Sequence, residues 1–206
     1  MTETRTIRWS DRLAVRAHAP VDVASLAAFR VLFGVLLTVA PVRFLLNGWV
    51  DAQYGLTSFK FRYYGFEWVP VPGLETIRLE FALLAPLGLA IALGAAYRLA
   101  VPAYALVFAH LKLIDATNYL NHDYLVFLLL VVMSVLPLHA AWSVDARLFP
   151  RVARGSVPAW MTWLPRFQVG LVYVFAAAAK CTEDWLLHAQ PVGIWLRSRS
   201  ELPLLG

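Results

Sequence analysis

Long apolar runs separated by short polar or charged segments form the dominant pattern of this chain. Five runs approach or exceed the length of a membrane span, with approximate bounds 23–46, 77–97, 99–114, 124–142 and 160–180. A helix needs roughly 20 consecutive apolar residues to cross the hydrocarbon core of a bilayer. The pattern therefore predicts an all-α protein, a polytopic integral membrane bundle of about five transmembrane helices, and it contains no internal repeat.

The segments outside these runs carry further signals. Arginines recur at helical spacing in residues 1–20, which predicts a basic amphipathic helix on an anionic cytoplasmic membrane surface or, alternatively, a solvated arm. Asp22 is a candidate N-cap for the first span, so the transmembrane domain is expected to occupy residues 21–206. The aromatic segment 47–77 is too polar to span the membrane and is expected at the interface, where it could line a cavity.

Composition supports a membrane protein and excludes other classes. The chain is 60% hydrophobic and 15% charged, whereas soluble domains average roughly 45–50% apolar and about 25% charged residues. Its net charge of +5 comes from arginines between the apolar runs, so no nucleic acid partner is expected. A single cysteine excludes an internal disulfide, and five scattered histidines show no metal-ligand spacing, so no metal site is expected.

The distribution of arginines predicts the orientation of the chain in the membrane. With a cytoplasmic N-terminus, the inner segments carry most of the arginines, as the positive-inside rule requires. These are Arg5, Arg8, Arg12, Arg16, Arg98, Arg147, Arg151, Arg154 and Arg166. The link "DATNYLNHD" (115–123) then lies on the outer face, together with Lys180 at the end of the fifth run.

Polar side chains are concentrated in this link between the third and fourth apolar runs. They are Asp115, Asn118, Asn121, His122 and Asp123. Such groups are costly when they face lipid and need partners, and Asn and His can bind a ligand oxygen or, for His, exchange protons. The alternative is an ordinary interhelical turn in which Asn118 or Asn121 caps the next helix. His110 and Lys112 could extend the cluster.

A second candidate group lies in "YVFAAAAKCTEDW" (173–185), at the end of the fifth run. Lys180 precedes two acids and Trp185, which is typical of an interfacial anchor. The alternative is a lysine that faces the bundle interior, where loss of hydration favours the neutral amine and lets it act as a base. The small residues 176–179 favour this second interpretation, because they allow close packing of helices.

Arg30 is a third polar position, inside the first apolar run. A charge at such a position needs a partner or a function. Its place near the inner end of the run sets it far from Lys180, so we expect it to organise the inner face of the bundle.

The two polar segments resemble the vitamin K-dependent gamma-carboxylase family, whose membrane domain is also described as HTTM. "LIDATNYLNHDYL" (113–125) matches the family's Asp, short polar link and Asn-His-x-Tyr-Leu at a helix start. "YVFAAAAKCTEDW" matches its segment with a lysine ahead of Asp-Trp. "FRVLFG", "YYGFEWVP" and "RFQVGLVY" are supporting matches, and the resemblance covers nearly the whole chain in the family's order.

The resemblance implies an enzyme that uses reduced vitamin K or menaquinone, with O2 and CO2 as co-substrates. Lys180 matches the base that deprotonates the hydroquinone, and Asn121 with His122 would hold the quinone oxygens or the developing oxyanion. Oxygenation yields an epoxide through a basic alkoxide, which removes the γ-proton of a glutamate before CO2 adds. The other substrate- or cofactor-binding candidates are Asp115, which would orient the base site, Tyr124 and Trp185.

Two departures from the family carboxylase limit which part of this reaction we expect the chain to perform. Ala179 stands where the family has a second lysine, and the C-terminal helices and the outer domain that grips the substrate peptide are missing. We therefore expect a short homologue that retains the quinone reaction, with membrane lipid, quinone and a glutamate-containing protein or a partner chain as partners. A bacterial source would imply menaquinone and the inner membrane, with the active site on the extracytoplasmic face.

Two other functions remain open. A non-catalytic membrane module with the same fold could bind quinone or lipid, or scaffold a neighbouring protein. A transporter-like bundle is disfavoured, because the sequence shows no broken helices or paired half-helices. A Lys180 that faces the bundle interior near Asn121 and His122 would favour the enzyme, whereas one that points at headgroups would favour the module.

Overall fold

The computed structural model describes residues 9–56 and 59–198, which are mostly helical. The chain forms two compact units, Met1–Pro165 and Arg166–Gly206. The helices are α1 (Trp9–His18), α2 (Ala24–Leu46), α3 (Leu74–Leu93), α4 (Tyr97–Leu113), α5 (Asn121–Val135), α6 (Val144–Leu148), α7 (Ala159–Ala179), α8 (Glu183–Leu186) and α9 (Val192–Arg197). Short turns of π- or 3-10 type are Asp51–Gly55, Ala116–Asn118 and Leu138–Ala140. The prediction of an all-α protein is confirmed.

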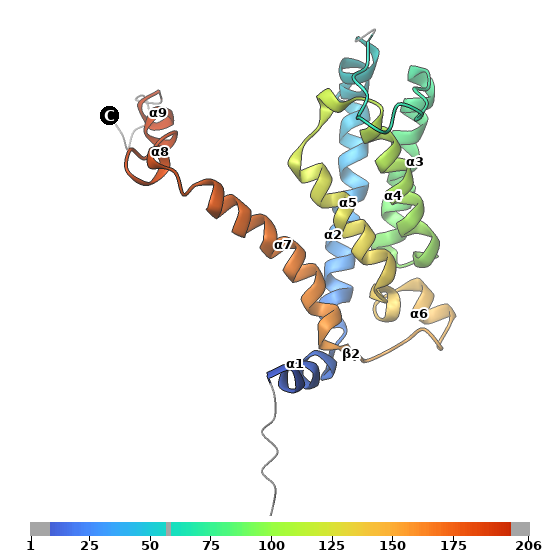
Figure 1. Cartoon of the computed structure of the whole chain (residues 1–206). Coiled ribbons are helices and arrows are strands. Elements are labelled where there is room, and N and C mark those ends of the chain that lie inside the picture. Colours follow the sequence, from blue (N-terminus) through green and yellow to red (C-terminus); the bar gives the residue numbers. More distant parts are fainter. Residues whose placement is uncertain (1–8, 57–58, 199–206) are drawn as a thin grey trace, which may run out of the picture. The chain divides into compact units, whose positions relative to one another are not determined.

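Helices α2, α3, α4 and α5 form the body of the first unit, where each packs against the next along the chain (Figure 1). Two glycines bring α2 and α3 close together. A Cβ atom added at Gly34 would lie 2.5 Å from the backbone nitrogen of Ala92, and one added at Gly88 would lie 2.7 Å from that of Thr38. Side chains such as Leu84 and Ile91 are buried in the core of this unit.

Two helices, α2 and α3, are long and apolar enough to cross a membrane in the part of the chain that the structure describes. Both expose large apolar side chains, among them Leu32 and Leu79, as lipid-facing helices do. Helices α4 and α5 have 17 and 15 residues and are short for a span. Helix α7 is long enough, but Arg166 and Gln168 interrupt its apolar sequence. The five-span bundle is therefore not confirmed.

Several helix ends differ from the predicted bounds, for local reasons. Helix α3 ends at Leu93 rather than near 97, because Gly94 adopts a left-handed conformation (φ 63°) that closes the helix. Helix α5 begins at Asn121 and ends at Val135, not 142, because Leu136 precedes Pro137 and is extended. The 3-10 turn Leu138–Ala140 follows.

The N-terminal helix α1 falls within the predicted amphipathic segment and has no buried residue. It exposes Trp9 and Leu13, and in Figure 1 it lies at the lower end of α2. Strand β1 (Pro20–Asp22) pairs antiparallel with β2 (Ser156–Pro158) and ties this end of the chain to the start of α7. Asp22 Oδ1 accepts a hydrogen bond from Ala24 N at 2.7 Å, so the carboxylate serves the first turn of α2, whose N-cap position is Val23. Arg5 and Arg8 lie outside the described residues.

Arg30 joins α2 to the end of α3 and to the segment beyond α5. Its side chain is fully buried (0% exposed). Nη1 donates to the carbonyl of Ile91 at 2.9 Å and also to that of Ala92. Nε donates to Leu138 O at 3.1 Å, and Nη2 to Trp142 O at 2.6 Å. Arg30 thus has a structural role, with backbone carbonyls as its partners, and its place at the inner face of the membrane stays a prediction.

Candidate functional site

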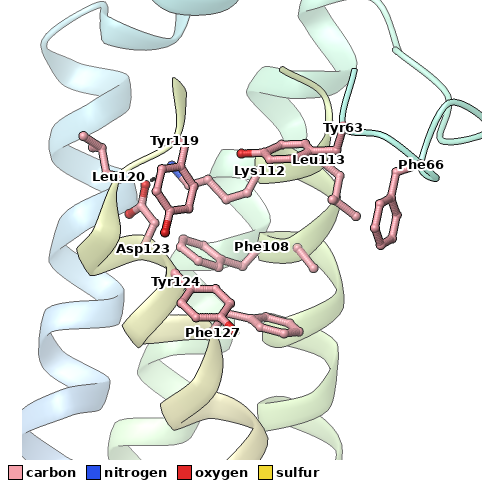
Figure 2. A pocket seen from close by; sticks show the side chains of 11 residues that line it. Tyr63, Phe66, Phe108, Lys112, Leu113, Tyr119, Leu120, Asp123, Tyr124 and Phe127 are labelled. Carbon is pink, nitrogen blue, oxygen red and sulfur yellow. Dashed lines mark ion pairs between the residues drawn. The ribbon is translucent and has the colours of Figure 1, made fainter. Parts of the chain in front are cut away.

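A cavity of about 400 Å³ lies in the first unit, beside the polar link between α4 and α5. Its walls come from three parts of the chain: the aromatic loop before α3, the last turns of α4, and the link with the first turns of α5 (Figure 2). The lining residues are Tyr63, Phe66, Phe108, Ala109, Lys112, Leu113, Tyr119, Leu120, Asp123, Tyr124 and Phe127. Most are aromatic or aliphatic, so the cavity suits an apolar ring.

One ion pair is set into this apolar lining. Lys112 Nζ lies 2.7 Å from Asp123 Oδ2, and the two side chains are 23% and 15% exposed. The lysine nitrogen also lies 5.4 Å from the centroid of the Phe108 ring, within the range of a cation–π contact. Phe108 and Lys112 are four residues apart on α4, and Asp123 and Phe127 are four apart on α5, so on each helix a charged and an aromatic side chain share the face that lines the cavity.

Asp115 does not line the cavity itself but supports the loop and the link that do. The residue is 2% exposed, and its Oδ1 accepts hydrogen bonds from Thr117 N (3.1 Å) and Thr117 Oγ1 (2.8 Å). The same oxygen accepts from Phe61 N at 3.3 Å, and Ala116 N donates to Phe61 O at 2.7 Å. These contacts fasten the aromatic loop to the link and place Tyr63 at the cavity. The role of Asp115 as a direct ligand contact stays a prediction.

Asn121 and His122 open α5 and lie outside the cavity lining. Both are exposed, and the His122 side chain is 72% exposed, with Nε2 3.8 Å from Asp123 Oδ1. The N-cap position of α5 is Leu120 and makes no side-chain capping bond, so neither Asn118 nor Asn121 caps the helix as the alternative required. Of the residues predicted in this region, Asp123 in the link and Tyr124 just after it do line the cavity.

Most of the cavity was not identified from the sequence. Lys112 was expected only as an extension of the polar cluster, and Phe108 and Tyr119 were missed. Tyr63 and Phe66 belong to the aromatic segment 47–77 that was expected to line a cavity, although the individual residues were not named. The four-residue spacing of aromatic and charged residues on α4 and α5 was the available signal. Burial, followed by the nearby Tyr119, Asp115 and Asp123, raises the pKa of the Tyr63 hydroxyl.

In the second unit, Lys180 directly follows α7. It is exposed within this unit, and its Nζ lies 5.0 Å from the centroid of the Trp185 ring. Lys180 therefore makes a cation–π contact with Trp185, and its role as a base or as an anchor stays a prediction. Cys181, the next residue, is exposed and carries a free thiol.

Within the described ranges, no three His, Cys, Asp or Glu side chains are grouped so that they could hold a metal ion.

A comparison with known protein families covers nearly the whole chain. The sequence model of a family described as the HTTM domain matches residues 18–206. The match includes the cavity, the polar link and the Lys180 segment. No solved structure matches the chain.

Proposed function

The chain belongs to the HTTM domain family, and on that premise we propose that it binds a reduced quinone and couples its oxygenation to proton abstraction or carboxylation at a glutamate. The family and the two long apolar helices indicate a membrane protein. A quinone is lipid-soluble and can reach such a protein laterally from the bilayer. Vitamin K and menaquinone are the candidate substrates, with O2 and CO2 as co-substrates.

The aromatic cavity is the observation that carries this proposal. Its volume of about 400 Å³ falls in the range of roughly 300–1,000 Å³ that is usual for small-molecule sites. Aromatic walls favour a flat ring, since offset and edge-to-face ring contacts add to the burial of apolar surface. The cavity is also built from the segment that resembles the family's Asn-His-x-Tyr-Leu motif, through Asp123 and Tyr124.

In the proposed reaction, Lys180 takes a proton from the hydroquinone and Asn121 with His122 stabilises the negative oxygen that forms. The hydroquinone and O2 then give the quinone epoxide and water. When a glutamate is present, the alkoxide formed on the way removes its γ-proton, and the carbanion adds CO2. Asp115, Tyr124 and Trp185 would shape or contact the quinone site.

A non-catalytic quinone- or lipid-binding module is the second candidate, and a specific observation favours it. Lys180 is exposed in its unit with its ammonium group over Trp185, which is also the arrangement of an interfacial anchor. An anchor needs a positive charge at this position, whereas a base must be able to lose it. Replacement by arginine therefore separates the two functions.

Quinone epoxidation tests the proposal. Purified protein in lipid nanodiscs receives reduced vitamin K or menaquinone with O2, and mass spectrometry detects the epoxide. We expect Lys180→Ala to lower the rate by about 100-fold or more. We expect Lys180→Arg to be equally inactive, because arginine does not lose its proton in proteins.

Lys60→Ala is the matched control, because Lys60 lies outside the cavity lining and donates to Tyr54 O at 2.9 Å. It should retain epoxidation. Full activity in the Lys180→Arg variant would contradict the assignment of the base. Quinone binding without epoxide, in folded wild-type protein, would favour the non-catalytic module.

A further inference from the structure

We propose that Lys112 and Asp123 make the cavity selective for an aromatic ligand that carries a ring hydroxyl, and so for the hydroquinone over the quinone. The proposal rests on the proposed function in one respect, the identification of the ligand as a quinone. It adds a reason why the reduced form is retained in the site.

The position of the ion pair is the first observation. Lys112 and Asp123 are the charged members of the cavity lining, and they meet at 2.7 Å among aromatic rings. Partial burial of two charges in an apolar site costs desolvation free energy, and well-packed apolar residues would often serve stability equally well. The presence of the pair in such a lining is therefore better explained by a role in ligand binding than by a contribution to stability.

The hydrogen-bonding capacity of the pair is the second step. A lysine ammonium has three donors and no acceptor, and an ionised carboxylate only accepts. Their mutual contact uses one donor of Lys112, so both groups keep capacity for a further partner. A ring hydroxyl can donate to Asp123 and accept from Lys112 at the same time, without breaking the pair.

A quinone carbonyl cannot do this, because it only accepts. It can accept from Lys112, but it offers no donor to the remaining acceptor capacity of the Asp123 carboxylate and brings two acceptor oxygens close together. Hydrogen bonds to charged groups are about twice as strong as neutral ones. Sites built to bind a hydroxyl reject an analogue without it for this reason.

The arrangement of the rings places a ligand oxygen at the pair. Figure 2 shows Phe108, Tyr124 and Phe127 grouped on one side of Lys112 and Asp123, with Tyr119 beside the pair. A ring that packs against this aromatic group directs its oxygen toward the two charges. Because Lys112 comes from α4 and Asp123 from α5, helix packing holds the distance between the two groups.

The selectivity has a consequence for turnover. The substrate of the proposed reaction carries hydroxyls, whereas the epoxide carries carbonyls. The pair therefore holds the substrate more tightly than the product, and the oxidised form leaves the cavity.

Anaerobic binding to the full chain in nanodiscs tests the inference without any need for turnover. The probes are vitamin K1 hydroquinone and vitamin K1 quinone, each measured by mass spectrometry after filtration, with empty nanodiscs subtracted for partition into lipid. We expect wild-type protein to bind the hydroquinone about tenfold or more tightly than the quinone. Asp123→Asn should reduce the preference for the hydroquinone, because the amide accepts more weakly than the carboxylate and adds a donor that a quinone carbonyl can use.

Two further variants guard against misfolding and nonspecific effects. The double variant Lys112→Met/Asp123→Leu replaces the pair with apolar side chains of similar size, so it should keep quinone affinity and lose the preference. Glu80→Gln is the control, because Glu80 pairs with His110 at 2.9 Å in the same unit and lies outside the cavity lining. It should keep the preference.

Each outcome has a distinct meaning. Equal affinity of wild-type protein for the two forms, or a preference that persists in the double variant, overturns the inference and leaves the proposed function standing. A preference that depends on Lys112 and Asp123, in protein that forms no epoxide with O2, supports the inference and contradicts the catalytic proposal. Binding of neither form overturns both.

Discussion

At the scale of single residues, Arg30 shows how a charge can be kept inside an apolar helix. Its donors are distributed over carbonyls at the end of α3 and in the segment beyond α5. The last carbonyls of a helix have no partner within the helix and carry partial negative charge, so they suit a guanidinium group. The planar fork of arginine can serve several such carbonyls at once, which an ammonium group cannot.

Replacement of Arg30 should destabilise the first unit strongly. Arg30→Met keeps much of the side-chain volume but leaves the buried carbonyls of Ala92 and Leu138 without their donor, and Arg30→Lys supplies too few donors. We expect a loss of about 3 kcal/mol or more of unfolding free energy. Thermal unfolding of detergent-purified protein measures it.

Arg43→Met is the matched control for Arg30. It lies on the same helix but is exposed, with its guanidinium 5.8 Å from the centroid of the Trp49 ring. Its effect should stay within about 0.5 kcal/mol. Similar losses in the Arg30 and Arg43 variants would show that the buried contacts contribute little.

At the scale of elements, the contact between α2 and α3 depends on two glycines that have no room for a side chain. The Cβ of an alanine at Gly34 would meet the backbone of Ala92, and that of an alanine at Gly88 would meet the backbone at Leu37 and Thr38. Backbone atoms cannot rotate away as a side chain can. Small residues at such positions are how helices approach closely in membranes.

Alanine at either glycine should therefore destabilise the protein, although alanine is normally the better helix former. We expect Gly34→Ala and Gly88→Ala each to cost about 1–3 kcal/mol, the range for an overpacked contact. Gly170→Ala is the control, since within the second unit nothing lies within 4 Å of its Cβ position on α7. It should be neutral or stabilising by roughly 0.5–1 kcal/mol. The same sign of change in all three variants would rule out the close approach as the cause.

At the scale of the whole molecule, the number of membrane crossings decides where the Lys180 segment lies. A cytoplasmic N-terminus and five crossings put this segment outside, whereas an even number of crossings would put it inside. The chain carries its own reporter, because Cys181 is the sole cysteine and is exposed.

A membrane-impermeant maleimide should thus label Cys181 in intact cells. Cys181→Ser measures the background. Ser10→Cys in that cysteine-free protein reports on α1, where residue 10 is exposed, and should react only after the membrane is permeabilised. Labelling of Cys181 that requires permeabilisation would contradict the five-span arrangement and the outer position of Lys180.

The sequence by itself determined the features that depend on neighbouring residues. Apolar runs of the right length predicted all the main helices, since helix formation and burial of one face are local properties. The isolated charge of Arg30 predicted a structural role. The exact ends of α3 and α5 also depend on nearby residues, but Gly94 and Pro137 were overlooked as the signals that end these helices.

Only the tertiary structure decided the cavity. Lys112 and Asp123 meet because of the rotation of α4 relative to α5 about their axes, and no run of residues encodes that angle. Tyr63 reaches the cavity because Asp115 accepts a hydrogen bond from Phe61, 54 residues earlier in the chain. The residues that resemble the family motif marked the right segment, but packing chose which of its side chains face inward: Asp123 and Tyr124 line the cavity, and His122 does not.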